Sequence, residues 1–364
     1  MDSYKFLALL KQVFVALLLV SVLVACGSGG SDSSSSTSVS AESESLSSED
    51  EGPISSSPEA PPETDPTPVG IQRDSIRQFT FNHSLWQHNS SQHTNMVTGF
   101  WVGEFARESG TTYSWGGQFG QLVDHALPPR AWLGSDNSAD LSPLGDSAII
   151  RDIGLDNVLI MPPNFVQGGD SIARSTSLAE HLTISQRVID WIIDESVSGG
   201  QKSGLPIYIY EHWQEAISDN LTESQFQAYH DVTTGTYHQW FLDYQNGLLA
   251  LYPSVDFRTI PVGPIIADIL QNDALAASQL SFTDLYEDES PHGKPNIYFL
   301  AGLVTYQAMY GQQVSEAYRP TIDPFGGVSD QLAGQENFNA LNNFVWERLN
   351  YYNANGVRIW LEAP

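Results

Sequence analysis

The sequence predicts an α/β domain: a three-layer α/β/α sandwich with a mostly parallel sheet, spanning residues 71–364. Short apolar segments of strand length alternate along this region with longer segments of helical spacing. Several short segments are apolar at consecutive positions, which is typical of parallel strands buried on both faces. Strands separated by helices favour a parallel sheet covered on both sides.

Each expected element has its own local signal. The segment 76–81 alternates apolar and polar residues like a half-exposed strand, and 157–161 is a short apolar run followed by two prolines. The stretch from Thr222 to Gln225 has the pattern of a helix start. We expect the other strands at 205–210 and 255–260, and helices at 94–108, 178–196, 223–247, 263–278, 296–310 and 335–354.

The first 70 residues differ in composition from the rest and predict an export signal and a tether. Residues 1–25 combine a basic start with the apolar run VFVALLLVSVLVA, as a secretory signal does. Residues 26–70 consist largely of Ser, Pro, Gly and acidic residues and contain no Lys or Arg. Such a segment cannot bury enough surface to offset the entropy cost of ordering, so we expect a disordered spacer.

Cys26 directly follows Leu23-Val24-Ala25 and is the single cysteine of the chain. This segment resembles the lipobox of bacterial lipoproteins, whose cysteine is acylated and becomes the mature N-terminus. The resemblance implies an exported protein at the periplasmic or cell-surface side, held to the membrane through its lipid alone. Gly27 stands where an aspartate would favour inner-membrane retention, so we expect the outer membrane. No later segment approaches the roughly 18 apolar residues of a membrane span.

Composition and missing motifs exclude several function classes. A net charge of −28 argues against nucleic acid or an anionic lipid surface as partner. A single cysteine forms no internal disulfide and no cysteine-rich zinc site. The sequence has no HExxH, Walker loop, G-x-G-x-x-G or G-x-S-x-G, so we expect no metal, no nucleotide cofactor and no α/β-hydrolase elbow.

Polar residues directly follow the expected strands, where sites in parallel sheets lie. Ser84 follows the first strand, Asn164 follows the strand at 157–161, and the acidic pair Asp288 and Glu289 precedes His292 and a late helix. A serine nucleophile needs a base, usually histidine, and the histidine needs an acid to orient it. Asparagine and backbone amides can stabilise an oxyanion. The pattern therefore predicts a hydrolytic site.

Four segments resemble, in order, the sequence blocks of the SGNH (GDSL-type) hydrolase family. They are FNHSLWQ at 81–87, SWGGQFGQL at 114–122, LIMPPNF at 159–165 and LYEDESPHGKPNIYFLAGLVTYQAMYG at 285–311. The resemblance implies a flavodoxin-like fold and a serine esterase without a cofactor. Ser84 would be the nucleophile and His292 the base, while Gly117, less clearly Gly120, and Asn164 would form the oxyanion hole.

The sequence departs from the family pattern at several positions. The acid three residues before His292 is Glu289 rather than aspartate, and Asp288 lies one residue further back, so either could orient the imidazole. NHSL at 82–85 lacks the glycine and aspartate of GDSL, and the third block lacks its glycine and aspartate. These substitutions leave open a catalytically inactive member of the family.

Two functions follow from these residues. The first is a lipoprotein esterase acting on ester substrates, including acylated saccharides, with Glu211, His212 and Trp213 shaping the substrate pocket. The second is an inactive SGNH-like lipoprotein that binds glycans or partner proteins.

Overall fold

The computed structural model describes residues 73–88, 96–125, 154–162, 177–198, 204–214, 222–288, 292–318 and 327–360. All of them belong to one compact unit, Glu63–Pro364. The expected signal, Cys26 and the tether lie outside the described residues, as do Asn164 and Glu289. Within the described ranges, no helix combines the length and the apolar character that a membrane crossing needs.

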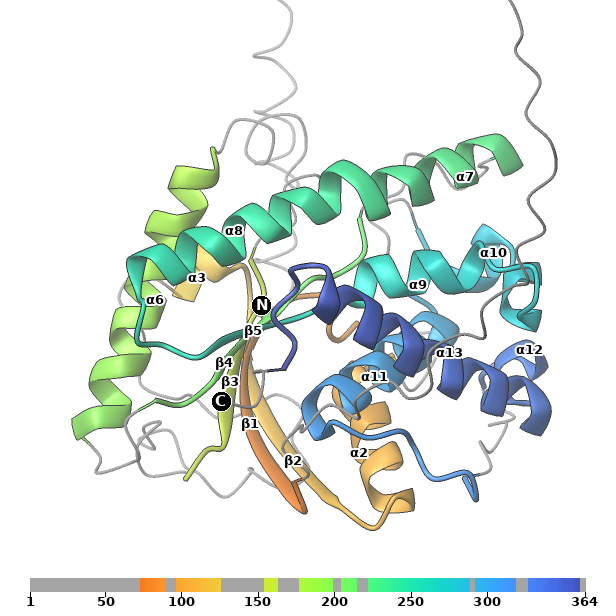
Figure 1. Ribbon diagram of the computed structural model, residues 1–364, viewed down its shortest axis with the longest axis horizontal. Helices are drawn as coiled ribbons and strands as arrows, with labels where there is room; N and C mark the ends of the chain where they lie inside the picture. The colour runs from red at the N-terminus through yellow and green to blue at the C-terminus, as the bar shows by residue number, and fades with distance from the viewer. Residues whose placement is uncertain are drawn as a thin grey trace, which may run out of the picture. The chain divides into compact units, whose positions relative to one another are not determined.

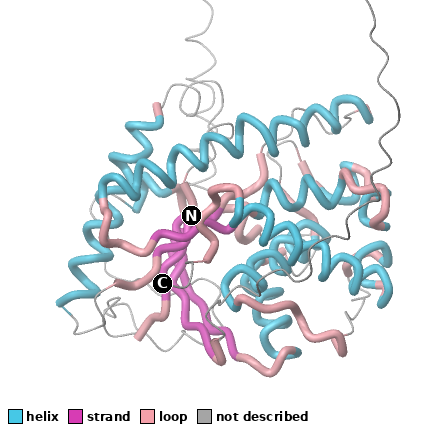
Figure 2. The backbone as a smooth tube through the Cα atoms, viewed as in Figure 1, coloured by secondary structure: helices cyan, strands magenta, loops and turns pink. Residues whose placement is uncertain are grey.

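Five parallel strands form one sheet in the order β2-β1-β3-β4-β5 (Figures 1 and 2). They are β1 (Ser75–Asn82), β2 (Thr112–Phe119), β3 (Asn157–Ile160), β4 (Ile207–Tyr210) and β5 (Phe257–Ile260). This is the strand order of flavodoxin-like folds, so the predicted fold class is confirmed. The chain adds β2 on one side of β1 and all later strands on the other, so the winding direction reverses between β1 and β3.

Strand β2 has no counterpart among the predicted strands. Its sequence, TYSWGGQF, carries two glycines, and glycine is disfavoured in strand interiors. In the sheet Gly117 lies opposite Thr80, and a Cβ atom at Gly117 would lie 2.0 Å from Thr80 Oγ1 and 2.3 Å from the Thr80 carbonyl oxygen. The close contact with Thr80 therefore leaves room only for glycine at position 117. Because glycine is unfavourable in strands, the sequence pattern does not predict a strand here.

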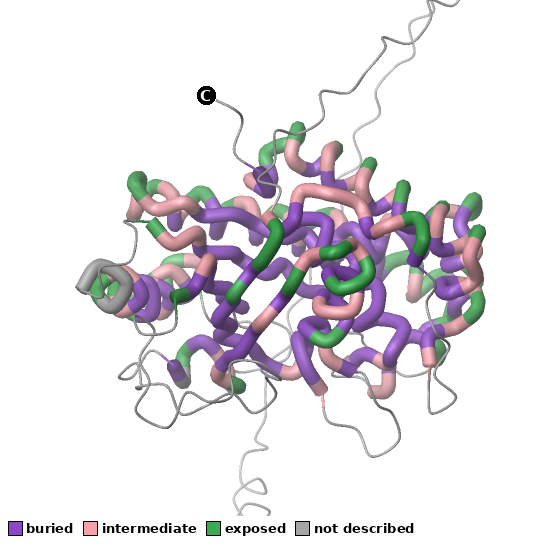
Figure 3. The backbone as a smooth tube through the Cα atoms, turned by 90° about the horizontal axis from the view of Figure 1, so that it is seen from below, coloured by how far each residue is buried: buried purple, intermediate pink, exposed green. Residues whose placement is uncertain are grey.

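Helices cover both faces of the sheet and enclose two separate cores (Figure 1). Alternate strand residues supply them: Val158 and Ile160 face one core, and Leu159 and Met161 face the other. The first core is covered by α3 (Leu122–His125), α6 (Leu178–Ser198) and α8 (His238–Leu251). The second is covered by α2 (Thr98–Glu108), α9 (Val262–Leu270), α11 (Pro295–Tyr310) and α13 (Gln335–Ala354). The buried residues gather in the interior of the domain (Figure 3).

Two predicted helices are interrupted. The helix expected at 223–247 begins as predicted, because the Thr222 side chain caps the Gln225 amide, but it forms α7 (Glu223–Val232), a π-helical turn (Thr233–Tyr237) and then α8. The helix expected at 263–278 ends with α9 at Leu270 and resumes as a 3-10 turn at Ala276–Gln279. Three short helices of the described residues were not predicted: α3, α10 (Phe282–Leu285) and α12 (Asp330–Ala333).

Gly302 on α11 permits close packing of this helix against α2, and we expect Gly302→Ala to lower stability. The added Cβ would lie 2.4 Å from the Cβ atom of Trp101, which no rotamer change can move. Overpacking of this kind costs about 1–3 kcal/mol. Gly103→Ala is the matched control, because Tyr113 Cδ1 lies 3.9 Å from the new Cβ and helix propensity favours alanine. Urea unfolding of both variants checks this; equal midpoints would contradict it.

Candidate active site

The site lies where the sheet reverses its winding direction, at the carboxyl ends of β1 and β3. Ligand sites in open α/β sheets occur at this position, because the loops that leave the two strands diverge there. Residues 83–88 continue from β1, and Met161 and Pro162 continue from β3. The Met161 amide donates to the Phe81 carbonyl (3.0 Å), so the two strand ends stay joined up to the start of the loops.

Ser84 lies in a tight turn directly after β1. The Trp86 amide donates to the His83 carbonyl (2.9 Å), and the Leu85 amide donates to Nδ1 of the His83 side chain (3.3 Å). Leu85 and Trp86 are fully buried, whereas Ser84 is partly exposed. The turn is therefore anchored on both sides of the serine, which is the local order that a nucleophile needs.

His292 and Asp288 form a dyad in a second, closed loop. Asp288 Oδ2 lies 2.6 Å from His292 Nδ1, and the His292 amide donates to Asp288 Oδ1 (3.0 Å). The loop is closed because the Glu287 amide donates to the His292 carbonyl (2.8 Å) and the Lys294 amide donates to the Leu285 carbonyl (2.7 Å). With Nδ1 bound to a carboxylate, Nε2 is the nitrogen left to act as a base.

Of the two acids considered for the site, the structure describes Asp288. Asp288 contacts the imidazole directly, while Glu289 lies outside the described residues. Asp288 and His292 both lie between the two residues of an antiparallel bridge, Tyr286 and Gly293. That bridge places both side chains near the neck of the loop.

The Ser84 turn and the His292 loop are in direct contact. Tyr298 Oη, on the first turns of α11, donates to the Ser84 carbonyl (2.6 Å). The His88 ring stacks on the His292 ring, with centroids 3.9 Å apart and planes 8° from parallel. His88 Nε2 also lies 3.6 Å from Glu287 Oε2. The candidate nucleophile and the candidate base therefore belong to adjoining loops on one rim of the sheet, although they are about 200 positions apart in the chain.

Two further imidazoles, His83 and His212, are buried beneath this rim with their rings edge to face at 5.0 Å. His212 Nε2 lies 3.2 Å from the Pro162 carbonyl oxygen, and Nδ1 lies 3.0 Å from the Trp213 carbonyl oxygen and 2.8 Å from Tyr237 Oη. Burial lowers the pKa of His212 to about 4. Burial and the neighbouring His212 lower the pKa of His83 well below its usual value. Both rings are therefore neutral and act as fixed supports.

Glu211, His212 and Trp213, which were predicted to line a substrate pocket, are buried, so their placement gives that prediction no support. The three side chains are 0–1 % exposed. Glu211 pairs with His238 at 2.7 Å, and the Trp213 ring packs on Tyr298 at 5.8 Å. Burial raises the pKa of the Glu211 carboxyl, opposed by His238. The segment follows β4 as expected, but its side chains point into the protein and hold neighbouring elements.

Both glycines assigned to the oxyanion hole, Gly117 and Gly120, lie among the described residues. Gly117 lies inside β2. The Thr112 amide donates to the Asp74 carbonyl, directly before β1, and the Gly120 amide donates to a carbonyl of β1, so alternation along the strand directs the Gly117 amide away from β1 and from the Ser84 turn. The Gly120 amide donates to the Asn82 carbonyl (2.8 Å). The oxyanion role of these two glycines stays a prediction without support from this placement, and Asn164 lies outside the described residues.

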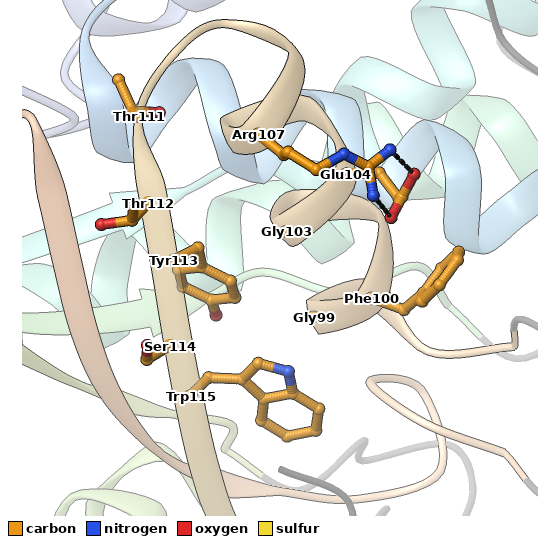
Figure 4. A pocket seen from close by; sticks show the side chains of 10 residues that line it. All are labelled: Gly99, Phe100, Gly103, Glu104, Arg107, Thr111, Thr112, Tyr113, Ser114 and Trp115. Carbon is orange, nitrogen blue, oxygen red and sulfur yellow. Dashed lines mark hydrogen bonds and ion pairs between the residues drawn. The ribbon is translucent and has the colours of Figure 1, made fainter. Parts of the chain in front are cut away.

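A groove of about 590 Å³ lies between α2 and the edge strand β2 (Figure 4). The Tyr113 and Trp115 rings point from the strand toward Gly99 and Gly103 of the helix (Figure 4). Trp115 contacts Trp86 edge to face at 5.7 Å, so the wall of the groove packs directly under the Ser84 turn. A Cβ at Gly99 would lie 2.4 Å from the Trp115 ring, and this glycine therefore lets the indole lie between α2 and the turn.

The similarity of this chain to known proteins is low. No protein-family model matches the chain, and no curated protein sequence matches it. A solved structure, a family 3 carbohydrate esterase from Clostridium thermocellum, is similar with a TM-score of 0.38 and 10 % sequence identity. The similarity covers 64 % of this chain and 94 % of that one.

The buried imidazoles predict how stability depends on pH. An unfolded histidine binds a proton below about pH 6.5, whereas His212 stays neutral in the fold down to about pH 4. Its contribution to stability is therefore complete above pH 6.5 and is lost as the pH falls toward 4. We expect His212→Gln, whose side-chain amide is polar but does not titrate, to reduce the slope of unfolding free energy against pH by about 1.4 kcal/mol per pH unit in this window. Urea unfolding between pH 4 and 7 measures both slopes, which must differ.

Proposed function

We propose that this protein is a serine hydrolase that cleaves ester bonds, with Ser84 as nucleophile, His292 as base and Asp288 as the acid that orients His292. The observation that carries the proposal is the contact between the Ser84 turn and the loop that holds the His292–Asp288 dyad. A serine hydroxyl has little nucleophilicity until a neighbouring base removes its proton. A carboxylate on Nδ1 fixes the tautomer that leaves Nε2 basic.

The reaction proceeds in two steps, acylation of Ser84 and hydrolysis of the acyl-enzyme. Ser84 Oγ adds to the ester carbonyl carbon while His292 Nε2 takes the hydroxyl proton; the alcohol then leaves with that proton, and the acyl group stays on Ser84. A water molecule next gives a proton to His292 and adds to the acyl carbon, and the carboxylic acid leaves as Ser84 regains the proton. Asp288 stabilises the imidazolium formed in each step.

The proposed substrates are esters, including acylated saccharides, since deacylation needs no group beyond this triad and water. The finer assignment to saccharides is supported by the family resemblance of the four sequence blocks. We also propose export and membrane attachment through a lipid on Cys26, supported by the signal sequence at 1–25 and the residues around the cysteine.

Replacement of the triad residues tests the reaction. We expect Ser84→Ala to lower kcat on p-nitrophenyl acetate by a factor on the order of 10⁴ and Asp288→Asn by about 10² to 10⁴, because each removes a group that acts in the transition state. Ser254→Ala is the matched control. This exposed serine precedes β5, so it lies near the amino-terminal ends of the parallel strands, whereas the site lies at their carboxyl ends. Circular dichroism confirms that each variant is folded.

Three results would contradict the proposal in distinguishable ways. Equal turnover by Ser84→Ala would reject the nucleophile. A larger loss in Glu289→Gln than in Asp288→Asn would reassign the acid. No turnover of any ester by the wild-type protein, together with saturable binding to glycan arrays, would favour the inactive binding protein.

The lipid anchor has its own test. We expect wild-type protein in a Gram-negative host to fractionate with outer membranes and Cys26→Ser to appear in the soluble periplasmic fraction, because the anchor requires the thiol. Mass spectrometry of the N-terminal peptide checks for the acyl chains. Membrane retention of Cys26→Ser would contradict a lipid as the anchor.

A further inference from the structure

His88 is the residue of the Ser84 loop that contacts the base. It lies four positions after Ser84, and its backbone is fixed because the His88 amide donates to the Met96 carbonyl (2.9 Å) beside a bridge between Gln87 and Val97. Its ring lies flat on the His292 ring, at 3.9 Å and 8°. No sequence motif assigned a role to His88, and the two-step reaction above does not use it.

The hydrogen bond to Asp288 does not by itself fix the orientation of the His292 ring. A single hydrogen bond at Nδ1 holds one corner of the imidazole, but the ring can still rock about the Nδ1–Oδ2 line and carry Nε2 out of position. A flat ring in van der Waals contact with one face blocks that motion on its side. Misplacing a base by about 1 Å can cost as much as 10²-fold in rate, so such a support has a measurable value.

Burial and the neighbouring His292 favour a neutral His88 ring, against the effect of two nearby carboxylates. Glu287 approaches its Nε2 at 3.6 Å, Asp288 faces it from the same loop, and His292 covers its face. Burial and His292 lower the pKa of His88, and the two carboxylates oppose this shift without cancelling it. A neutral ring tolerates a positive charge on its stacked neighbour, which is the state His292 reaches when it takes the Ser84 proton.

We propose that His88 is a positioning residue that holds the His292 ring by stacking, and so couples the base to the loop that carries the nucleophile. This inference rests on the proposed hydrolase function. The loop 83–88 then supplies both the attacking hydroxyl and the surface against which the base is set. A displacement of the loop moves both together, so the distance between hydroxyl and imidazole is protected.

The experiment compares three variants in the full-length domain. We expect His88→Ala to lower kcat roughly tenfold with little change in KM, because the base loses its support while substrate binding does not involve the stack. We expect His88→Phe to recover most of the rate, since a phenyl ring provides the same flat contact without a charge. Glu287→Gln, which keeps the stack and removes the carboxylate that faces His88 Nε2, should change kcat less than twofold.

A fluorophosphonate reagent gives a second readout that needs no matching ester, because it labels a serine only when a base activates it. Its rate of reaction with Ser84 should follow the order wild type, His88→Phe, His88→Ala. Labelling in Ser84→Ala should be absent.

The outcomes separate the two proposals. If wild-type Ser84 is neither labelled nor able to turn over esters, the hydrolase function fails and the role of His88 fails with it. If wild type is active and His88→Ala equals it in kcat and labelling rate, the hydrolase stands and the stacking role is wrong. If His88→Phe is as impaired as His88→Ala, or if His88→Ala is inactive while His292→Ala is not, His88 acts through its nitrogens and the positioning role is overturned.

Discussion

The structure of the site depends on one constraint, the reversal of winding at β1. β1 pairs in parallel with β2 on one side and β3 on the other, and α2 and α6, which follow β1 and β3, cover opposite faces of the sheet. Ligand sites in such sheets occupy the space beyond the carboxyl ends of these two strands. The Ser84 turn forms one wall of that space. The His292 loop, which precedes α11, reaches it because α11 packs against α2, directly beside the turn.

Burial outweighs charge in the layer below the rim. His83 and His212 have the same intrinsic chemistry as His88 and His292, yet they lie fully inside the protein, where desolvation of an imidazolium costs more than any nearby group returns. They therefore serve as neutral hydrogen-bonding rings: His212 holds the Pro162 carbonyl and His83 holds the Leu85 amide. His292 is partly exposed and has a carboxylate on Nδ1, an arrangement suited to a ring that must accept a proton during the reaction.

Sequence patterns predict the parts of this fold that repeat a local signal, and they miss the parts decided by tertiary contact. Periodicity locates β1, β3, β4 and β5 and the long helices, and the order of polar residues after strands locates Ser84 and His292. Strand β2 is missed because Gly117 must avoid Thr80. The partner of the buried Glu211 is His238, the first residue of α8 after the π-helical turn, and no local pattern relates these two residues. The stack of His88 on His292 likewise joins two loops that no local pattern relates.

The departure of NHSL from the family motif can be judged from the same contacts. An aspartate before the serine could accept the Leu85 amide, as short acidic side chains do in tight turns. His83 Nδ1 accepts that amide here at 3.3 Å, so the turn keeps its hydrogen bond. At a fully buried position a carboxylate would need a compensating cation, whereas a neutral imidazole needs none and packs its ring against His212. The substitution therefore preserves the local shape of the turn around Ser84, and the missing aspartate is not by itself evidence for an inactive protein.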